Sequence, residues 1–316
     1  MRTFGRRLLE FSRRRRIPLT IVGSVAVAAV LAAVLAGRRA EFTAALSSVS
    51  LAVLAGTALL QVVALVSRSE AWHLTIEAAG GTVSRRVLYR ASSMQVLGGV
   101  LNGHHGVAAR IAALRRSSPD TCPQVPTLVA AEFPILAIEA MLAAAASFTL
   151  VVPLGLAWWL PLIALAVVGL VSAALRQLAL RKGRELWRGL AVLRSFRGGS
   201  RVVGFVLVAV VAQILRNWIL LRAVGVDASL LDATAVLIAV VTLGQLPVGP
   251  TVGAAAAVLI LGHDGVAAAA AGGLLLTVTG TIGGLCFVVW AGLDHVVSAA
   301  RAVRSRPAPR PESSAG

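Results

Sequence analysis

The chain has 316 residues, of which 58% are hydrophobic, and its mean hydropathy is +0.85. Soluble domains are roughly half apolar, so this composition and several runs of about 20 apolar residues indicate a polytopic membrane protein. No segment of mixed polarity is long enough for a separate soluble catalytic domain. The formal charge of +17 comes mainly from Arg beside apolar runs, which is the positive-inside pattern rather than a nucleic-acid surface.

The apolar runs predict an all-α bundle that crosses the membrane about six times. Residues 1–16 carry seven Arg and form a basic cytoplasmic N-terminus, and residues 17–295 form one transmembrane domain. Residues 296–316 form a disordered basic cytoplasmic tail, so both termini lie inside the plasma membrane. The first apolar run is read as an uncleaved span rather than a signal peptide because it is about 20 residues long. The six expected spans are 17–37, 45–67, 127–151, 156–176, 202–223 and 266–292.

Two further apolar segments do not fit as ordinary spans. Residues 68–90, read as an amphipathic segment along the interface, and the loop 113–126 are both basic and are expected on the cytoplasmic side. Residues 91–112 would then enter and leave on that same side as a re-entrant hairpin. Residues 233–262 are interrupted by "GQLPVGPTVG" and would form a second hairpin from the outside. The alternative is eight or more ordinary spans.

The first hairpin carries an unusual polar cluster, "NGHHGVAAR". Arg110 could bind the phosphate of a lipid headgroup together with Asn102, His105 and Gly106, because Arg pairs with phosphate through a fork of N–H groups. Alternatively, Arg110 lies at the membrane boundary and extends to water. The pair His104 and His105 could exchange a proton or simply lie at the interface.

Two acids lie seven residues apart in the third span, and therefore on one helix face, with Pro134 between them. Glu132 and Glu139 could line a cavity and orient the headgroup contacts. The alternative is a structural salt bridge to Arg110 or Arg216.

A third polar set comprises Gln213, Arg216 and Asn217 in the fifth span. Arg216 and Asn217 are candidates for a headgroup contact nearer the outer side. Alternatively, Arg216 extends outward or pairs with Asp227 or Asp232.

The second hairpin and the last span contain the remaining signals. Pro247, Pro250 and Gly253 are the expected hinge between two short helices. Gly273, Gly280 and Gly284 lie near one face of the last span and indicate close helix packing. The two cysteines show no metal-site spacing, so no metal or other cofactor is expected.

Four stretches resemble the lysylphosphatidylglycerol synthase transmembrane family, also called flippase-like or UPF0104 proteins. They are "SRSEAWHLTIEAAGGTVS", "NGHHGVAAR", "AAEFPILAIEAML" and "LRAVGVDASLLDATAV" with the following "LGQLPVGPTVGA". Asn102, Gly106, Arg110 and Glu132 match the family pattern, while Val107 and Phe133 stand where the family has an acid and an Arg. The resemblance implies a membrane domain that binds and translocates lipids, in some members fused to an aminoacyl-tRNA-using transferase for which this chain has no room.

The sequence therefore favours a lipid transporter over an enzyme. We expect it to bind and translocate a phospholipid or isoprenoid lipid with an anionic, phosphate-bearing headgroup, and to have no nucleic-acid partner. The alternative is a non-catalytic membrane partner of a lipid-linked glycosyltransferase or another lipid-modifying enzyme. A further alternative is that the chain is itself a polyprenyl-phosphate glycosyltransferase. Such enzymes usually need carboxylates near the membrane face, and the absence of an acidic pair in the loop 113–126 argues against this alternative. The oligomeric state is left open.

Overall fold

A computed structural model describes residues 22–99, 103–181, 188–243, 251–262 and 265–304. Within these ranges the chain is helical and contains no strand. Helical residues 22–35 come first. The elements that follow are η1 (Ala36–Arg38), α2 (Arg39–Ser47), α3 (Leu51–Ala78), α4 (Arg85–Gly99), α5 (Gly103–Ser117), α6 (Val125–Ala130), α7 (Phe133–Ala146), η2 (Ser147–Leu150), α8 (Leu160–Arg181), η3 (Ala191–Arg194), α10 (Phe196–Ala223), α11 (Leu230–Leu243), α12 (Val252–Leu261) and α13 (Val266–Arg304).

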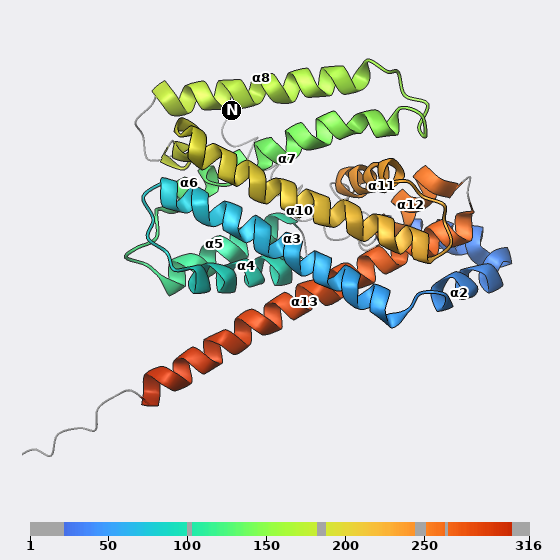
Figure 1. The fold of residues 1–316 in the computed structure, drawn as a ribbon, viewed down its shortest axis with the longest axis horizontal. Helices are drawn as coiled ribbons and strands as arrows, with labels where there is room; N and C mark the ends of the chain where they lie inside the picture. The colour runs from blue at the N-terminus through green and yellow to red at the C-terminus, as the bar shows by residue number, and fades with distance from the viewer. Residues whose placement is uncertain (1–21, 100–102, 182–187, 244–250, 263–264, 305–316) are drawn as a thin grey trace, which may run out of the picture.

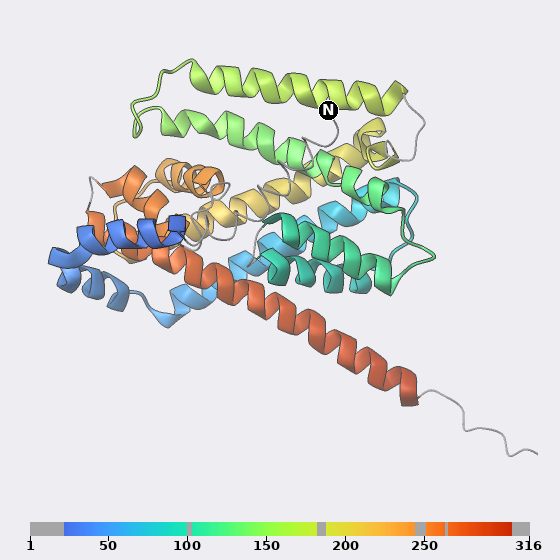
Figure 2. The same cartoon turned by 180° about the vertical axis from the view of Figure 1, so that it is seen from behind.

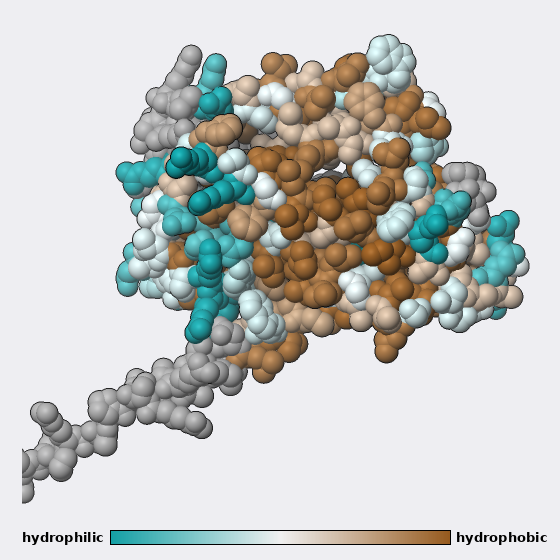
Figure 3. All heavy atoms as spheres, viewed as in Figure 1, coloured by the Kyte–Doolittle hydropathy of each residue, from teal (hydrophilic) through white to brown (hydrophobic). Residues whose placement is uncertain are grey.

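Six helical stretches of the described chain are long and apolar enough to cross a membrane, which confirms the expected all-α polytopic bundle. Five of them run lengthwise through the bundle, whereas Val22–Ser47 changes direction at η1 and lies at one end (Figures 1 and 2). The space-filling view shows a hydrophobic band across the middle and hydrophilic residues toward both ends (Figure 3). The six stretches are Val22–Ser47, Leu51–Ala78, Val125–Leu150, Leu160–Gln177, Phe196–Ala223 and Val266–Leu293.

The centre of the bundle is the antiparallel pair α3 and α10, each 28 residues long. Each helix begins at a serine cap, because the hydroxyl of Ser50 or Ser195 accepts a hydrogen bond from a free N–H of the first turn. Small residues at their interface, Ala64 of α3 with Ala209 and Ala212 of α10, form a buried cluster. Such residues let two helix backbones approach closely in a membrane.

Helices α4 and α5 form an antiparallel hairpin that begins and ends at one end of the bundle (Figures 1 and 2). The chain reaches α4 through a tight turn at Gly80, whose φ of 90° is one that L side chains rarely adopt. We call this end the basic end, because many Arg lie there: Arg85, Arg86, Arg115, Arg116, Arg176, Arg188, Arg197 and Arg201. The hairpin expected within residues 91–112 is therefore present, and its helices are longer than the sequence indicated.

Helices α11 and α12 form the second hairpin at the opposite end of the bundle. Helix α11 begins at a reciprocal cap: the Ser229 N–H donates to the Asp232 carboxylate at 2.9 Å, and the Asp232 N–H donates to the Ser229 hydroxyl. The two hairpins thus enter the bundle from opposite ends, each between a 28-residue span and a following span.

The segment 68–90 differs from the expectation of an interfacial helix. Helix α3 continues without interruption to Ala78, and Ser69, Glu70 and Trp72 are buried against its neighbours. They looked interfacial because polar and aromatic residues are typical of a membrane boundary, and the sequence alone does not show that these side chains are buried.

Three other boundaries also differ. Helix α13 continues to Arg304, so the first residues of the tail expected to be disordered from 296 are helical. The stretch "RRAEF", between the first two expected spans, lies in η1 and the first turns of α2, and the change of direction before α2 comes at η1 (Figure 2). The third span is divided into α6 and α7 at Ala131 and Glu132, just before Pro134. A proline here lacks the N–H that would continue the helical bonding pattern.

Candidate functional site

A buried ion pair joins the first hairpin to the third span. Arg110 of α5 is 1% exposed, and its guanidinium pairs with the Glu132 carboxylate at the break between α6 and α7. The same guanidinium lies over the ring of Trp72 in α3, with 3.8 Å between its central carbon and the ring centroid. Three elements therefore meet at one cation, which is held by a carboxylate and by an aromatic face.

A second ion pair lies close enough to act electrostatically on the first. Arg68 of α3 donates to Glu139 of α7 at 3.0 Å, and both side chains are about one-third exposed. Glu139 attracts Arg110, while Arg68 repels it. Two cations and two carboxylates thus form a charge-balanced cluster, which reduces the cost of placing each charge at membrane depth.

The partners of Arg110, Glu132 and Glu139 decide between the alternatives that the sequence left open. Glu132 makes the salt bridge to Arg110 that was considered, whereas Arg110 does not extend to water. Glu139 pairs with Arg68, a partner that sequence reasoning missed. No spacing within α3 identifies this partner, because the pair joins residues 71 positions apart on different helices.

Helix α4 of the first hairpin is fastened by a separate set of contacts. The Tyr89 hydroxyl donates to the Glu70 carboxylate, and Arg85 lies 3.4 Å from the other oxygen of that carboxylate. The Tyr89 ring also contacts Phe287 and Trp290 of α13, at centroid distances of 6.4 and 5.4 Å. Both helices of the hairpin are therefore tied to spans near the basic end.

Arg216 of α10 lies in a different environment. It is 9% exposed, and its guanidinium donates to the side-chain oxygen of Gln61 in α3, which also accepts from Gln213 at 2.9 Å. No carboxylate of the described chain pairs with Arg216, and its Nε has no hydrogen-bond partner there.

The proposed pairing of Arg216 with Asp227 or Asp232 is therefore not found. Asp227 pairs with Arg222, and Asp232 caps α11. Gln61 was missed because a single Gln within an apolar span has no distinctive pattern in sequence. Asn217, beside Arg216, is 1% exposed, and its side-chain oxygen has no partner in the described part of the chain.

Contacts along α13 show how close each hairpin lies to Arg216. Gly280 lies against Arg216, since a Cβ there would be 3.2 Å from the guanidinium. One turn toward the basic end, Gly284 packs against Val96 near the end of α4. In the other direction, Gly273 packs on Gly253 at the start of α12. Arg216 thus lies at a level between the inner ends of the two hairpins, within about 10 Å of each contact along α13.

These contacts also support the expected role of the glycines of α13. Gly273, Gly280 and Gly284 each bring α13 close to another element, which is the packing that their spacing indicated. Gly253 is buried in this contact. The other two hinge candidates, Pro247 and Pro250, lie outside the described residues.

The remaining candidates of the first hairpin are placed only in part. Gly106 is a buried residue of α5. His105 belongs to the same helix, but its side chain is outside the described part, and so is Asn102 as a whole. The structure therefore brings Arg110, Glu132 and Glu139 together and places Arg216 and Asn217 apart from them. In the described residues no group of three His, Cys, Asp or Glu side chains could hold a metal ion.

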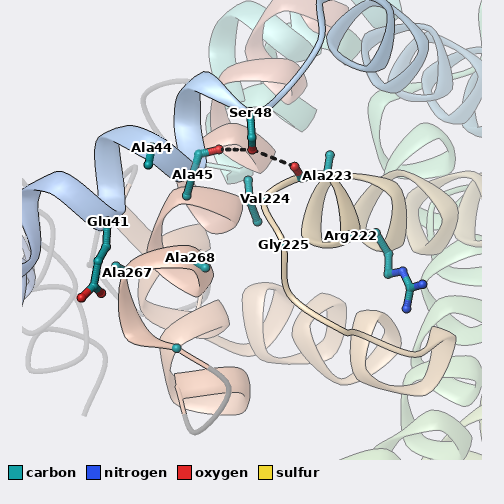
Figure 4. A pocket seen from close by; sticks show the side chains of 11 residues that line it. Glu41, Ala44, Ala45, Ser48, Arg222, Ala223, Val224, Gly225, Ala267 and Ala268 are labelled. Atoms are coloured by element: carbon teal, nitrogen blue, oxygen red, sulfur yellow. Dashed lines mark hydrogen bonds between the residues drawn. The ribbon is translucent and has the colours of Figure 1, made fainter.

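An open cavity of about 490 Å³ lies at the end opposite the basic end, between α2, the end of α10 and the start of α13. Its floor is formed by small residues, and Glu41 and Arg222 lie on opposite sides of it (Figure 4). The Ser48 hydroxyl lies within hydrogen-bond distance of the carbonyl oxygens of Ala45 and Ala223. This cavity makes no contact with Arg216 and is a surface depression beside the loops.

No family model, curated protein or solved structure matches the chain. The resemblance to the flippase-like family stays a prediction, and the function has to be inferred from the geometry of the described residues.

Proposed function

We propose that this integral membrane protein binds the phosphate of a lipid headgroup at Arg216 and carries it between the two leaflets. The observation that carries the proposal is the position of Arg216. It is a buried guanidinium that pairs with no carboxylate of the described residues, at the level where hairpins from opposite ends of the bundle approach each other.

The energetics favour an anionic ligand at this position. An Arg at the centre of a membrane costs about 2.5–3.5 kcal/mol on insertion scales, and Arg110 shows how an internal carboxylate offsets that cost. Arg216 instead donates to the neutral side chain of Gln61, which also accepts from Gln213, and no acid of the described chain pairs with it. A phosphate would supply the missing negative charge and could accept the free N–H of the guanidinium. Asn217 adds a buried amide close to this position.

The hairpins supply the elements that could open a path to either side. Paired interrupted segments in two halves of a chain, entering from opposite faces, are typical of transporters with a binding site near the midplane. The first hairpin is fastened to the spans by Arg110 with Glu132 and by Tyr89 with Glu70. We assign these contacts a positioning role, in which they hold the first hairpin against the spans while the headgroup occupies Arg216.

The basic end supports an orientation in the membrane. The Arg residues gathered there favour the cytoplasmic side, which would place both termini inside and would suit a plasma membrane. The proposal also agrees with the resemblance to flippase-like proteins, and it describes transport rather than catalysis.

Lipid translocation in proteoliposomes tests the proposal. The full chain is reconstituted with phosphatidylglycerol that carries a fluorescent acyl chain, and dithionite then bleaches the probe that reaches the outer leaflet. For the wild type we expect dithionite to bleach probe from both leaflets. For Arg216→Gln we expect it to bleach only the outer leaflet, while Arg216→Lys keeps part of the activity because it keeps the charge.

Arg222→Gln is the matched control, because Arg222 lies on the same helix but pairs with Asp227 at its exposed end. The control should retain wild-type activity, and thermal unfolding should show that every variant is folded. Equal activity of Arg216→Gln and the wild type would overturn the site. Wild-type vesicles that match empty vesicles would overturn transport and favour a non-catalytic partner of a lipid-modifying enzyme.

A further inference from the structure

A second feature of the bundle, distant from Arg216, is a groove between α7, α8 and α10. It has a volume of about 430 Å³, and its walls are almost entirely apolar. Its lining includes Phe133, Pro134, Met141, Leu142, Ser172 and Val203.

The groove exists because α8 is loosely attached to the bundle. In the most apolar 18-residue stretch of α8, only 6% is buried inside the bundle. The corresponding fraction is 33% for α10 and 39% for the span formed by α6 and α7. Helix α8 packs mainly on α7 and η3, and Figures 1 and 2 show it along one side of the bundle. The side chains that the structure describes therefore leave a space between α8 and α10.

Such a space needs an occupant. Protein interiors are close-packed, and a void of this size forfeits many van der Waals contacts. Water is a poor occupant, since an ordered water needs two to four polar partners and Ser172 is one of very few polar side chains in the lining. The groove opens on the lipid-facing side of the bundle, where lipid hydrocarbon chains can enter it.

The length of the groove matches one leaflet. Its lining on α7 runs from Phe133 to Leu142, which corresponds to a rise of about 14 Å, and half of a hydrocarbon core is about 15 Å thick. Phe133 lies at the basic end of α7, and Arg176 of α8 lines the groove at the same end. Arg176 is exposed and makes no ion pair with any residue that the structure describes.

We propose that this groove is a resident lipid site, in which one acyl chain of an anionic phospholipid fills the apolar space and its phosphate pairs with Arg176. The driving force is contact and charge rather than the hydrophobic effect, since acyl chains in the bilayer are as apolar as the lining. The lipid acts as a packing element between α8 and the bundle. The site does not depend on translocation at Arg216.

Native mass spectrometry of the purified full chain tests the site. The protein is equilibrated with equal amounts of phosphatidylglycerol and phosphatidylcholine, and the lipid retained after detergent washing is counted. We expect one retained phospholipid with phosphatidylglycerol in excess. Ala137→Phe fills the groove and should abolish retention, whereas Val167→Phe on the exposed face of α8 should not.

The headgroup contact is tested separately. Arg176→Gln should keep the lipid but lower the preference for phosphatidylglycerol by about two- to fivefold, the range of a partly exposed ion pair. Arg201→Gln, an exposed Arg at the same end, should leave the preference unchanged.

Three outcomes would overturn the site: no retained lipid in the wild type, equal retention in Ala137→Phe, or an unchanged preference in Arg176→Gln. Lipid translocation by Ala137→Phe is also measured. If this variant loses the bound lipid but still translocates lipid, the groove is a lipid site separate from Arg216.

Discussion

Removing the carboxylate of Glu132 should strongly destabilise the protein. Glu132→Gln leaves the Arg110 guanidinium in place, 1% exposed, with no other carboxylate of the described residues in direct contact. Loss of one partner from a buried ion pair costs about 3–5 kcal/mol, because the other charge stays buried and uncompensated. The stacking on Trp72 persists in this variant and does not offset that loss.

A double substitution separates the missing charge from the missing contact. Arg110→Met combined with Glu132→Leu removes both charges and fills a similar volume, and such replacements are often neutral or stabilising by about 1–4 kcal/mol. The lost cation–π contact costs on the order of 2 kcal/mol when it is desolvated, so the double variant should lie near the wild type. Asp227→Asn is the control, because its ion pair with Arg222 is largely exposed at the end of α10 and contributes at most about 1 kcal/mol.

The assay is unfolding of the purified protein in mixed micelles by added dodecyl sulfate, followed by tryptophan fluorescence. The single variant Glu132→Gln should unfold at clearly lower dodecyl sulfate than Asp227→Asn, and the double variant should recover. If Glu132→Gln and Asp227→Asn unfold together, or if the double variant is as unstable as the single one, the pair is not the buried contact described above.

Three further expectations follow from the same structure. Ser84→Cys and Ser117→Cys flank the first hairpin and should both react with an impermeant maleimide from one side of the membrane; reaction from opposite sides would mean that residues 85–117 cross it. Gly253→Ala should cost about 1–3 kcal/mol in thermal unfolding because its Cβ would overlap a backbone oxygen of α13, whereas Gly292→Ala, with nothing within 4 Å, should be neutral or slightly stabilising. Burial raises the pKa of the Cys122 thiol, so less thiolate is present at neutral pH. Its alkylation should therefore be slow at pH 7 and accelerate as the pH rises, and a rate equal to that of the unfolded chain would contradict the burial.

The sequence was sufficient for the architecture because its strongest signals are long and repetitive. Runs of about 20 apolar residues identify the spans, and the positions of the Arg clusters require the segment 91–112 to return to the side from which it came. Helix ends were less predictable. Ser69 and Glu70 suggest an interface when read alone, but in the bundle they lie within a helix that continues to Ala78.

The sequence predicted several charged residues of the candidate site but not which of them pair with one another. Sequence can show that Glu132 and Glu139 share a helix face, but not that one faces α5 and the other faces Arg68. Partner choice depends on how α3, α5 and α7 pack, and no periodicity within one segment contains that information. The contact between Arg216 and Gln61 is a similar case, since it joins residues 155 positions apart.

The two buried arginines show how the halves of the bundle differ. The halves have a similar plan, in which a long span, a hairpin and a further span follow in order, yet only the first hairpin contributes a cation that is balanced by acids. Arg110 already has an anion, so a second anion there would have to displace Glu132 and leave it buried without a partner. Arg216 has no such competitor in the described chain, and an incoming phosphate would lower the cost of a charge that is already present. The asymmetry therefore favours Arg216 as the position that binds ligand and Arg110 as the one that holds the hairpin, which is why loss of Arg216 should impair transport in a folded protein while loss of Glu132 should first impair folding.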